Sequence, residues 1–173
     1  MNCCQHPPRF ARAFAAFQYA DPLRECVHAV KFASNARLAR ALGYRLADVA
    51  ARHVDCARCD VVVPVPLHPR RHRDRGFNQA ALLARAVGDA LGLPLREQAL
   101  RRTKATRAQS QLEPRDRRAN VTDAFACRED NVRGGRVLLV DDVLTTGATA
   151  DACTTALLAA GAANVDVLVL ATN

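Results

Sequence analysis

The stretch Val137-Leu138-Leu139-Val140-Asp141-Asp142-Val143-Leu144-Thr145-Thr146-Gly147-Ala148-Thr149 decides the fold class of this chain. Residues 136–140 are predicted to form a strand, because Val137 to Val140 are a short apolar run that is typical of a strand buried on both faces of a parallel sheet. Two adjacent carboxylates follow at the carboxyl end of that strand, and a hydroxyl-rich turn then leads into a predicted helix over residues 149–160. This order predicts an α/β fold with a ligand site beyond the strand ends.

The turn after the acidic pair has the chemistry of a phosphate site. Thr145, Thr146 and Thr149 supply hydroxyl groups, and the first backbone N–H groups of a helix have no partner within the helix. Gly147 allows the backbone to approach an anion closely. A ribose 5-phosphate fits this stretch, with its phosphate on the threonine turn and its 2′- and 3′-hydroxyls on the two aspartates. The alternative interpretation is an acidic turn before a capped helix.

The rest of the sequence repeats this alternation of strands and helices. Apolar or β-branched runs predict strands or extended segments at residues 10–19, 60–66, 121–126 and 165–171. Apolar side chains at helical spacing predict helices at residues 21–32, 35–53 and 77–91. Residues 67–76 are predicted to form a basic loop. Residues 101–120 have Leu112 as their only large apolar side chain, so we expect a mobile loop there.

Length and composition limit the classes of protein. A chain of 173 residues is long enough for one well-buried domain and too short for two ordinary ones. No stretch approaches about 18 uncharged apolar residues, so no membrane span is predicted. The first residues lack the basic and apolar segments of a signal peptide. Seven cysteines without an export signal favour reduced thiols, and we expect a cytoplasmic protein.

The net charge of +8 comes from one central block. Residues 70–118 contain thirteen Lys and Arg against five Asp and Glu, and the other 12 basic and 12 acidic residues cancel. This placement predicts a site for a polyanion, such as a nucleic acid, a nucleotide or a sugar phosphate. A solvated arginine-rich face is the alternative.

The strand, acidic pair and Thr-Gly-x-Thr turn resemble the phosphoribosyl diphosphate (PRPP) loop of type I phosphoribosyltransferases. Other motifs, in the right order between residues 4 and 173, are similar to those of the ComF/GntX competence-protein family. They are Tyr19-x-x-Pro22-Leu23-Arg24 before Lys31-Phe32, Val63-Pro64-Val65-Pro66-Leu67-His68-Pro69-Arg70-Arg71 before Arg75-Gly76-Phe77-Asn78-Gln79, and Arg117-Arg118-x-Asn120-Val121 before Ala124-Phe125. The resemblance implies a type I phosphoribosyltransferase fold and a role in DNA uptake or in the use of external DNA.

The resemblance also implies roles for individual residues. The implied PRPP-binding residues are Asp141, Asp142, Thr145, Thr146, Gly147, Ala148 and Thr149. The implied pyrophosphate-binding residues are Arg70, Arg71, Arg73 and Arg75, whose guanidinium groups suit phosphate oxygens. Residues 103–118 match the flexible loop that closes over the sugar. Its Lys104 and Arg107 would stabilise developing charge, and together with Asp141 and Asp142 they are the candidate catalytic residues.

We expect a single domain over residues 1–173, with a mostly parallel central sheet flanked by helices. Residues 1–9 resemble the exit of a zinc ribbon. Residues 10–56 are expected to contain the leading helices and to form part of a hood over the cleft, and residues 57–173 are expected to form the core with the PRPP loop.

Zinc is not expected in this chain. Cys3, Cys4 and His6 do not supply a tetrahedral set with sensible spacing. The only set of four ligands that the sequence allows combines Cys3 and Cys4 with Cys56 and Cys59.

The function that the sequence predicts is Mg²⁺-dependent binding of PRPP or a ribonucleoside phosphate, with transfer of the phosphoribosyl group. Mg²⁺ prefers few direct protein ligands, so the ion would be held mainly through the ligand, with Asp141 and Asp142 as the nearby carboxylates. The alternative is a non-catalytic module that binds nucleotide or single-stranded DNA during DNA import. The macromolecular partners expected for such a role are single-stranded DNA and DNA-uptake proteins. No motif indicates the acceptor or the oligomeric state.

Overall fold

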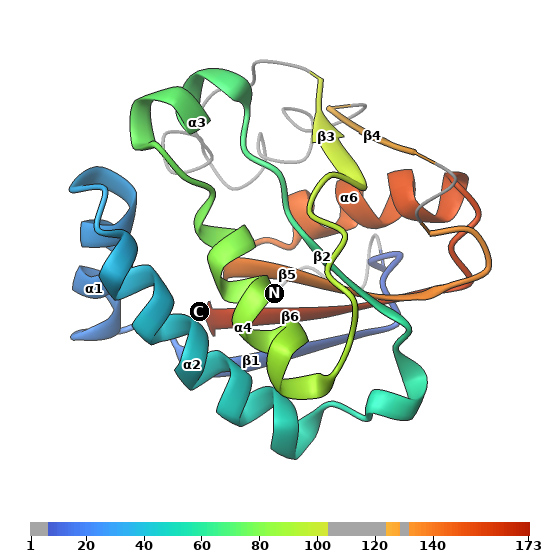
Figure 1. Cartoon of the computed structure of the whole chain (residues 1–173), viewed down its shortest axis with the longest axis horizontal. Helices are drawn as coiled ribbons and strands as arrows, with labels where there is room; N and C mark the ends of the chain where they lie inside the picture. Colours follow the sequence, from blue (N-terminus) through green and yellow to red (C-terminus); the bar gives the residue numbers. More distant parts are fainter. Residues whose placement is uncertain (1–6, 104–123, 129–131) are drawn as a thin grey trace.

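The computed structural model describes residues 7–103, 124–128 and 132–173. At its centre is a parallel sheet with the strand order β1-β6-β5-β2 (Figure 1). The strands are β1 (Arg12–Gln18), β2 (Val61–Pro64), β5 (Arg136–Leu144) and β6 (Asn164–Thr172). The register pairs Val62 with Leu138, and Leu138 with Asp166. The predicted α/β fold with a parallel sheet is therefore confirmed.

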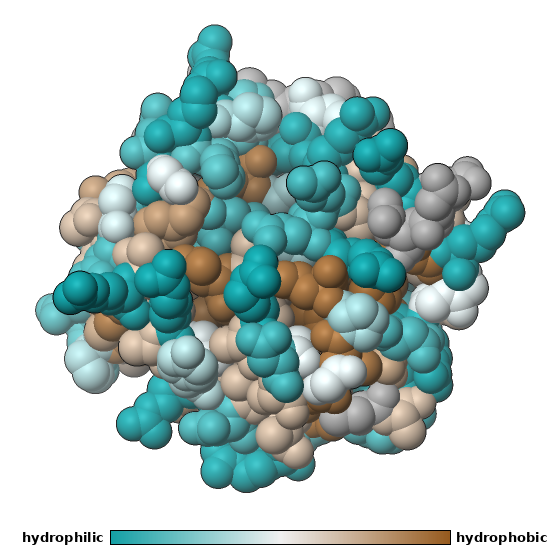
Figure 2. Space-filling model, in the orientation of Figure 1, coloured by the Kyte–Doolittle hydropathy of each residue, from teal (hydrophilic) through white to brown (hydrophobic). Residues whose placement is uncertain are grey.

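Helices cover both faces of this sheet (Figure 1). On one face lie α2 (Ala36–His53) and α4 (Gln79–Leu91). On the other lie α6 (Ala148–Ala159) and the antiparallel pair of β3 (Leu100–Arg102) and β4 (Phe125–Cys127). Figure 2 shows hydrophilic side chains projecting around the molecule, with apolar surface gathered in the middle of the face.

The valines of β2 explain why this strand occupies a buried position. Val61 and Val63 pack in the cluster under α6, whereas Val62 packs in the cluster under α4. All three are at most 6% exposed. An apolar run without alternation is thus buried on both faces, as parallel strands between two helical layers require.

Two shorter helices lie near the carboxyl ends of the strands, namely α1 (Leu23–Phe32) and α3 (Pro69–Arg75). The predicted hood at residues 10–56 is divided in the structure. Of residues 10–56, only α1 and its flanking residues line a pocket at the carboxyl ends of the strands. Strand β1 belongs to the central sheet because it pairs in parallel with β6, and α2 packs with α4 on the sheet.

The prediction of a basic loop at residues 67–76 is wrong, because the segment contains α3. The imidazole Nδ1 of His68 accepts a hydrogen bond from Arg70 N at 3.2 Å and caps the helix. Pro69 occupies the first turn, and Gly76 ends the helix with a left-handed φ of 81°. These start and stop residues determine the helix in spite of its polar composition.

Two further boundaries differ from the predictions. The strand predicted at residues 136–140 extends to Leu144, because Asp141 and the residues after it still pair with β6. The loop predicted at residues 101–120 begins inside β3, and its residues 104–120 lie outside the described part of the chain. Of the strand predicted at 121–126, only residues from 124 on are described. Within the described ranges, no helix combines the length and apolar character that crossing a membrane requires.

Candidate functional site

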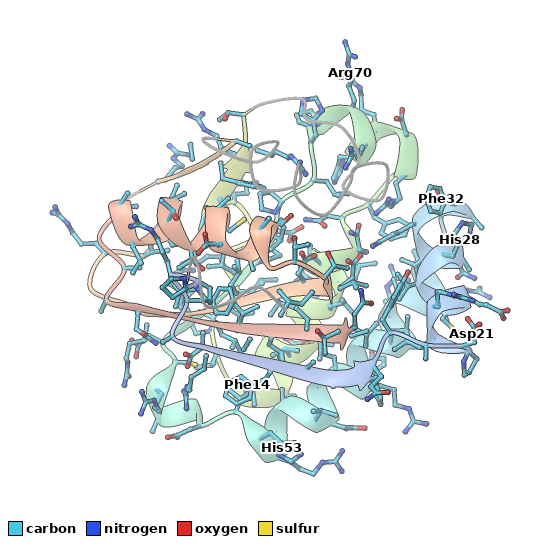
Figure 3. The ribbon with its side chains drawn as sticks, turned by 180° about the vertical axis from the view of Figure 1, so that it is seen from behind. Phe14, Asp21, His28, Phe32, His53 and Arg70 are labelled. Atoms are coloured by element: carbon cyan, nitrogen blue, oxygen red, sulfur yellow. The ribbon has the colours of Figure 1, made fainter. Side chains whose placement is uncertain are left out.

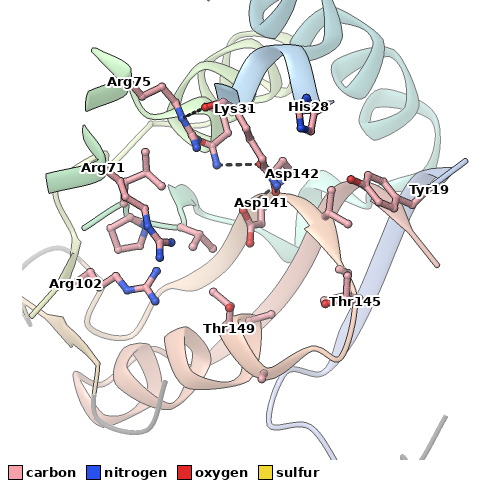
Figure 4. A pocket seen from close by; sticks show the side chains of 18 of the residues that line it. Tyr19, His28, Lys31, Arg71, Arg75, Arg102, Asp141, Asp142, Thr145 and Thr149 are labelled. Atoms are coloured by element: carbon pink, nitrogen blue, oxygen red, sulfur yellow. Dashed lines mark hydrogen bonds and ion pairs between the residues drawn. The ribbon is translucent and has the colours of Figure 1, made fainter. Parts of the chain in front are cut away.

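A pocket with a cavity volume of about 750 Å³ opens at the carboxyl end of β5 (Figure 4). Residues 141–150 line it continuously, so the structure brings all the predicted PRPP-loop residues to one place. The opposite walls come from α1, α3 and β3. This is the position that open parallel sheets use for ligands.

The turn between β5 and α6 takes its shape from Gly147. Its φ of 76° and ψ of −4° lie in the left-handed region, which residues with a Cβ rarely adopt. Gly147 is the N-cap residue of α6 and has no side chain to cap the helix. Thr146 Oγ1 accepts a long hydrogen bond from Ala148 N at 3.4 Å. The start of α6 and the hydroxyls around it can therefore bind an anion.

Asp142 is held by donors from two helices. Lys31 Nζ on α1 lies 3.0 Å from its carboxylate, and Gln79 Nε2 on α4 donates to Oδ2 at 2.9 Å. Burial lowers the pKa of Lys31, but the charge of Asp142 and its hydrogen bond outweigh this and raise the pKa overall. Lys31 is therefore protonated, and it neutralises Asp142, which is only 7% exposed.

Asp141 has a different environment. Its Oδ1 accepts a hydrogen bond from Asp142 N at 2.8 Å. Burial, followed by the charge of Asp142, raises the pKa of Asp141 to about 7. A cation or hydrogen-bond donor placed beside Asp141 would favour its ionised form near neutral pH. The two adjacent aspartates thus have different partners, although the sequence presents them as a pair.

The four predicted pyrophosphate-binding arginines separate onto two sides of α3. Arg71 and Arg75 are four residues apart on one side of the helix, and both line the pocket. Arg70 and Arg73 are exposed and do not line it. Figure 3 shows Arg70 pointing away from the body of the molecule.

Arg75 connects α3 to the residues that hold Asp142. Its Nε donates to the Lys31 carbonyl at 3.1 Å, and a terminal nitrogen donates to Gln79 Oε1. Burial lowers the pKa of Arg75. Arg75 therefore positions Lys31 and Gln79 beside Asp142 as well as lining the pocket.

Arg102, at the end of β3, completes the basic side of the pocket. It is 8% exposed, and its guanidinium lies 5.3 Å from the centre of the Phe125 ring. Burial and the charge of Arg71 lower its pKa. Figure 4 shows the guanidinium groups of Arg71 and Arg102 near one another at the pocket. Two close guanidinium groups of this kind favour a phosphate between them.

Sequence reasoning assigned no role to Lys31, Gln79 or Arg102. Lys31 and Asp142 are 111 residues apart in the chain, and no spacing pattern predicts their contact. Lys104 and Arg107, the other two candidate catalytic residues, lie outside the described residues.

An aromatic rim lies on α1 at the mouth of the pocket. The rings of His28 and Phe32 are 4.4 Å apart between centroids, and both residues line the pocket. Phe32 is 69% exposed, so its ring offers apolar surface to a planar group in the pocket.

Comparisons with known proteins agree with this geometry. Residues 74–173 match the family model described as phosphoribosyl transferase domain. DNA utilization protein YhgH of Escherichia coli K12 is 39% identical over 169 residues, which are 96% of this chain and 74% of that protein. Competence protein F of Haemophilus influenzae is 33% identical over 154 residues, which are 86% of this chain and 67% of that protein.

A solved structure, the allosteric regulatory enzyme of purine biosynthesis, is similar in fold. The TM-score is 0.54 at 24% identity, over 76% of this chain and 26% of that chain. This similarity supports the fold alone. The family model and the two relatives, taken together, lead to one conclusion: the chain belongs to the ComF family, within the phosphoribosyltransferase superfamily.

Proposed function

We propose that this chain binds PRPP, or a ribonucleoside phosphate, together with Mg²⁺ and transfers the phosphoribosyl group to an acceptor. The observation that carries the proposal is the meeting of three kinds of group in one pocket. The threonine turn suits the 5-phosphate, the aspartates suit the ribose hydroxyls, and Arg71 and Arg102 suit the pyrophosphate.

The donor set fits a magnesium ion that is held mainly by its ligand. In the described ranges, no group of three or more His, Cys, Asp and Glu side chains gathers to hold a metal. Mg²⁺ is usually bound by one or two carboxylates, substrate phosphates and water. Because Lys31 already neutralises Asp142, Asp141 is the carboxylate that would hold the ion. When bound, Mg²⁺ neutralises negative charge on the pyrophosphate.

In the transfer reaction, the bond between ribose C1 and a pyrophosphate oxygen breaks, and pyrophosphate leaves with the electron pair. A lone pair of the acceptor forms the new bond at C1, and the acceptor loses a proton to solvent. Arg71 and Arg102 would stabilise the charge that develops on the leaving group. The carboxylates would stabilise the positive charge that develops on the ribose. Phe32 offers a surface on which a planar acceptor can lie.

The relatives support a cellular role in DNA utilisation or competence, because their names state those processes. The second candidate function is a non-catalytic module that binds nucleotide or single-stranded DNA. The charge surplus of residues 70–118 favours it.

Calorimetry with PRPP and Mg²⁺ tests the binding proposal. Asp142→Asn and Thr146→Val should each weaken binding by about 1–3 kcal/mol, because the first removes a negative charge proposed to face the ribose hydroxyls and the second removes a hydroxyl proposed to face the phosphate. Thr155→Val is the matched control, since Thr155 is exposed on α6 and its hydroxyl donates to Asp151 O instead. Unchanged PRPP affinity in both site variants would reject the assignment.

Release of pyrophosphate from PRPP tests transfer. Nucleobases, amines and DNA-derived acceptors are each supplied with Mg²⁺, and the wild type is compared with the Asp141→Asn/Asp142→Asn double variant. A faster rate in the wild type with any acceptor supports a phosphoribosyltransferase. Equal rates with every acceptor would favour the binding module.

A further inference from the structure

A second groove continues from the candidate pocket along β3 to Arg128, the residue that follows β4. Its cavity volume is about 650 Å³, within the range of small-molecule sites. Pro66, Leu67 and Arg102 line both the pocket and this groove. A ligand in the groove therefore lies next to the proposed PRPP site, on the side of Arg102.

The groove carries an excess of positive charge. Arg101 on β3 and Arg128 after β4 line it together with Arg102. In the part of the chain that the structure describes, Arg101 and Arg128 have no carboxylate partner. Glu97 also lines the groove, but Arg85 NH2 lies 3.1 Å from its Oε2 and compensates its charge.

The walls between these arginines are apolar. Leu67 and Pro69 line the groove with accessible side chains, whereas Pro66 and Leu100, which also line it, are buried. Guanidinium groups suit phosphate oxygens, and the side chains of Leu67 and Pro69 offer contact surface to a sugar or a base. A nucleotide has both a phosphate and an apolar ring, so it matches this lining better than inorganic phosphate does. A DNA duplex keeps its bases stacked inside and would leave the apolar walls unused.

We infer that the groove of Arg101, Arg102 and Arg128 is a second binding site, which takes the phosphate of a nucleotide, either free or within a single strand. The site goes beyond the proposed function, because PRPP and Mg²⁺ occupy the first pocket alone. It does not depend on PRPP binding. Arg102 lines both cavities, so a nucleotide in the groove lies next to the first pocket. The groove therefore suits a phosphorylated acceptor of the proposed transfer, or the end of a DNA strand.

Fluorescence anisotropy with a fluorescein-labelled dT dodecamer tests the site, with dTMP as an unlabelled competitor. Arg101→Ala/Arg128→Ala is compared with the control Arg45→Ala/Arg52→Ala. The control removes the same charge from exposed positions on α2, across the sheet. Thermal melting verifies that both double variants fold.

We expect the groove variant to weaken dodecamer binding at least ten-fold, and the control to change it less than two-fold. Losing two phosphate contacts should also reduce the slope of log Kd against log salt by about 1.4, at about 0.7 per contact on a single strand. Displacement of the dodecamer by dTMP identifies a free nucleotide as a ligand. Dodecamer binding without displacement by dTMP identifies the strand. Both results support the site.

Equal losses in the two double variants would overturn the inference, because general electrostatic attraction would then explain binding. Absence of both dodecamer and dTMP binding would overturn it too. Displacement by polyglutamate as efficient as by unlabelled dodecamer would reject the nucleotide assignment. PRPP affinity, measured in parallel, separates the two sites. A distinct site is supported when the groove variant loses nucleotide binding while its PRPP affinity equals that of the wild type. The same conclusion holds when neither protein binds PRPP.

Discussion

Lys31→Met should destabilise the fold through Asp142, although the two residues are 111 positions apart. The side chains of Lys31 and Asp142 are 27% and 9% exposed, so the pair is only partly screened by water. Breaking a fully buried ion pair costs about 3–5 kcal/mol, and breaking an exposed one costs about 0–1 kcal/mol. Because Gln79 still donates to Asp142 in the variant, we expect an intermediate loss of about 2 kcal/mol. For a chain of this length, the melting temperature should fall by about 4–8 °C.

A double-mutant cycle isolates the pair itself. Urea unfolding at fixed pH is measured for Lys31→Met, Asp142→Asn and the double variant, and the coupling free energy should be about 1–2 kcal/mol. Arg85→Met with Glu97→Gln is the matched control. That pair has nearly the same separation, 3.1 Å against 3.0 Å, but its side chains are 61% and 46% exposed. A Lys31–Asp142 coupling no larger than that of the control would refute the reasoning.

Three other predictions concern the PRPP loop and the amino-terminal cysteines. The pKa of Asp141 is raised to about 7 in the folded protein, against about 3.9 in the unfolded chain. Between these two pH values the folded state binds more protons than the unfolded state. The free energy of unfolding should therefore fall as the pH rises from about 3.9 to about 7. Urea unfolding should show that Asp141→Asn removes most of this fall and is more stable than the wild type at pH 8; an equal fall in both proteins would contradict the cause. Gly147→Ala should lower the free energy of unfolding by about 1–2 kcal/mol, because φ is 76° there, and an unchanged melting curve would contradict this. The purified protein should contain no stoichiometric zinc by elemental analysis and should stay folded with a chelator. About one zinc per chain, with unfolding on chelation, would show that the cysteines form a structural site.

The parts of the site that are local in sequence were predictable. An apolar run, two acids, a threonine turn and Gly147 form a continuous stretch, and each step has a short-range physical cause. The burial of β5 follows from its continuous apolar run, and the turn follows from a residue that tolerates positive φ. The structure accordingly brings residues 141–150, which follow the apolar run, to one pocket.

The parts that depend on packing were not predictable from one sequence. Lys31 and Gln79 reach Asp142 only because α1 and the start of α4 both lie beside the carboxyl end of β5. Arg102 sits at the edge of a segment whose composition favoured a loop, and pairing with β4 places it in the pocket. The helix α3 is a different case. His68, Pro69 and Gly76 are ordinary helix boundary residues, but the basic composition between them favoured a loop. Because the segment is a helix, its arginines lie on two different sides.

The charge distribution of the pocket bears on the choice between a transferase and a module for nucleic acid. Burial and the neighbouring Asp142 hold the pKa of Asp141 up, and burial together with Arg71 holds the pKa of Arg102 down. A cation beside Asp141 relieves the first perturbation, and an anion beside Arg102 relieves the second. PRPP with Mg²⁺ brings both charges in one ligand. A DNA strand alone brings only anions, which match the arginine side and increase the repulsion at the aspartates. Asp142 already has Lys31 and Gln79 as partners, but Asp141 matches a ligand that carries hydroxyls or a cation, and this favours the phosphoribosyl ligand in the pocket.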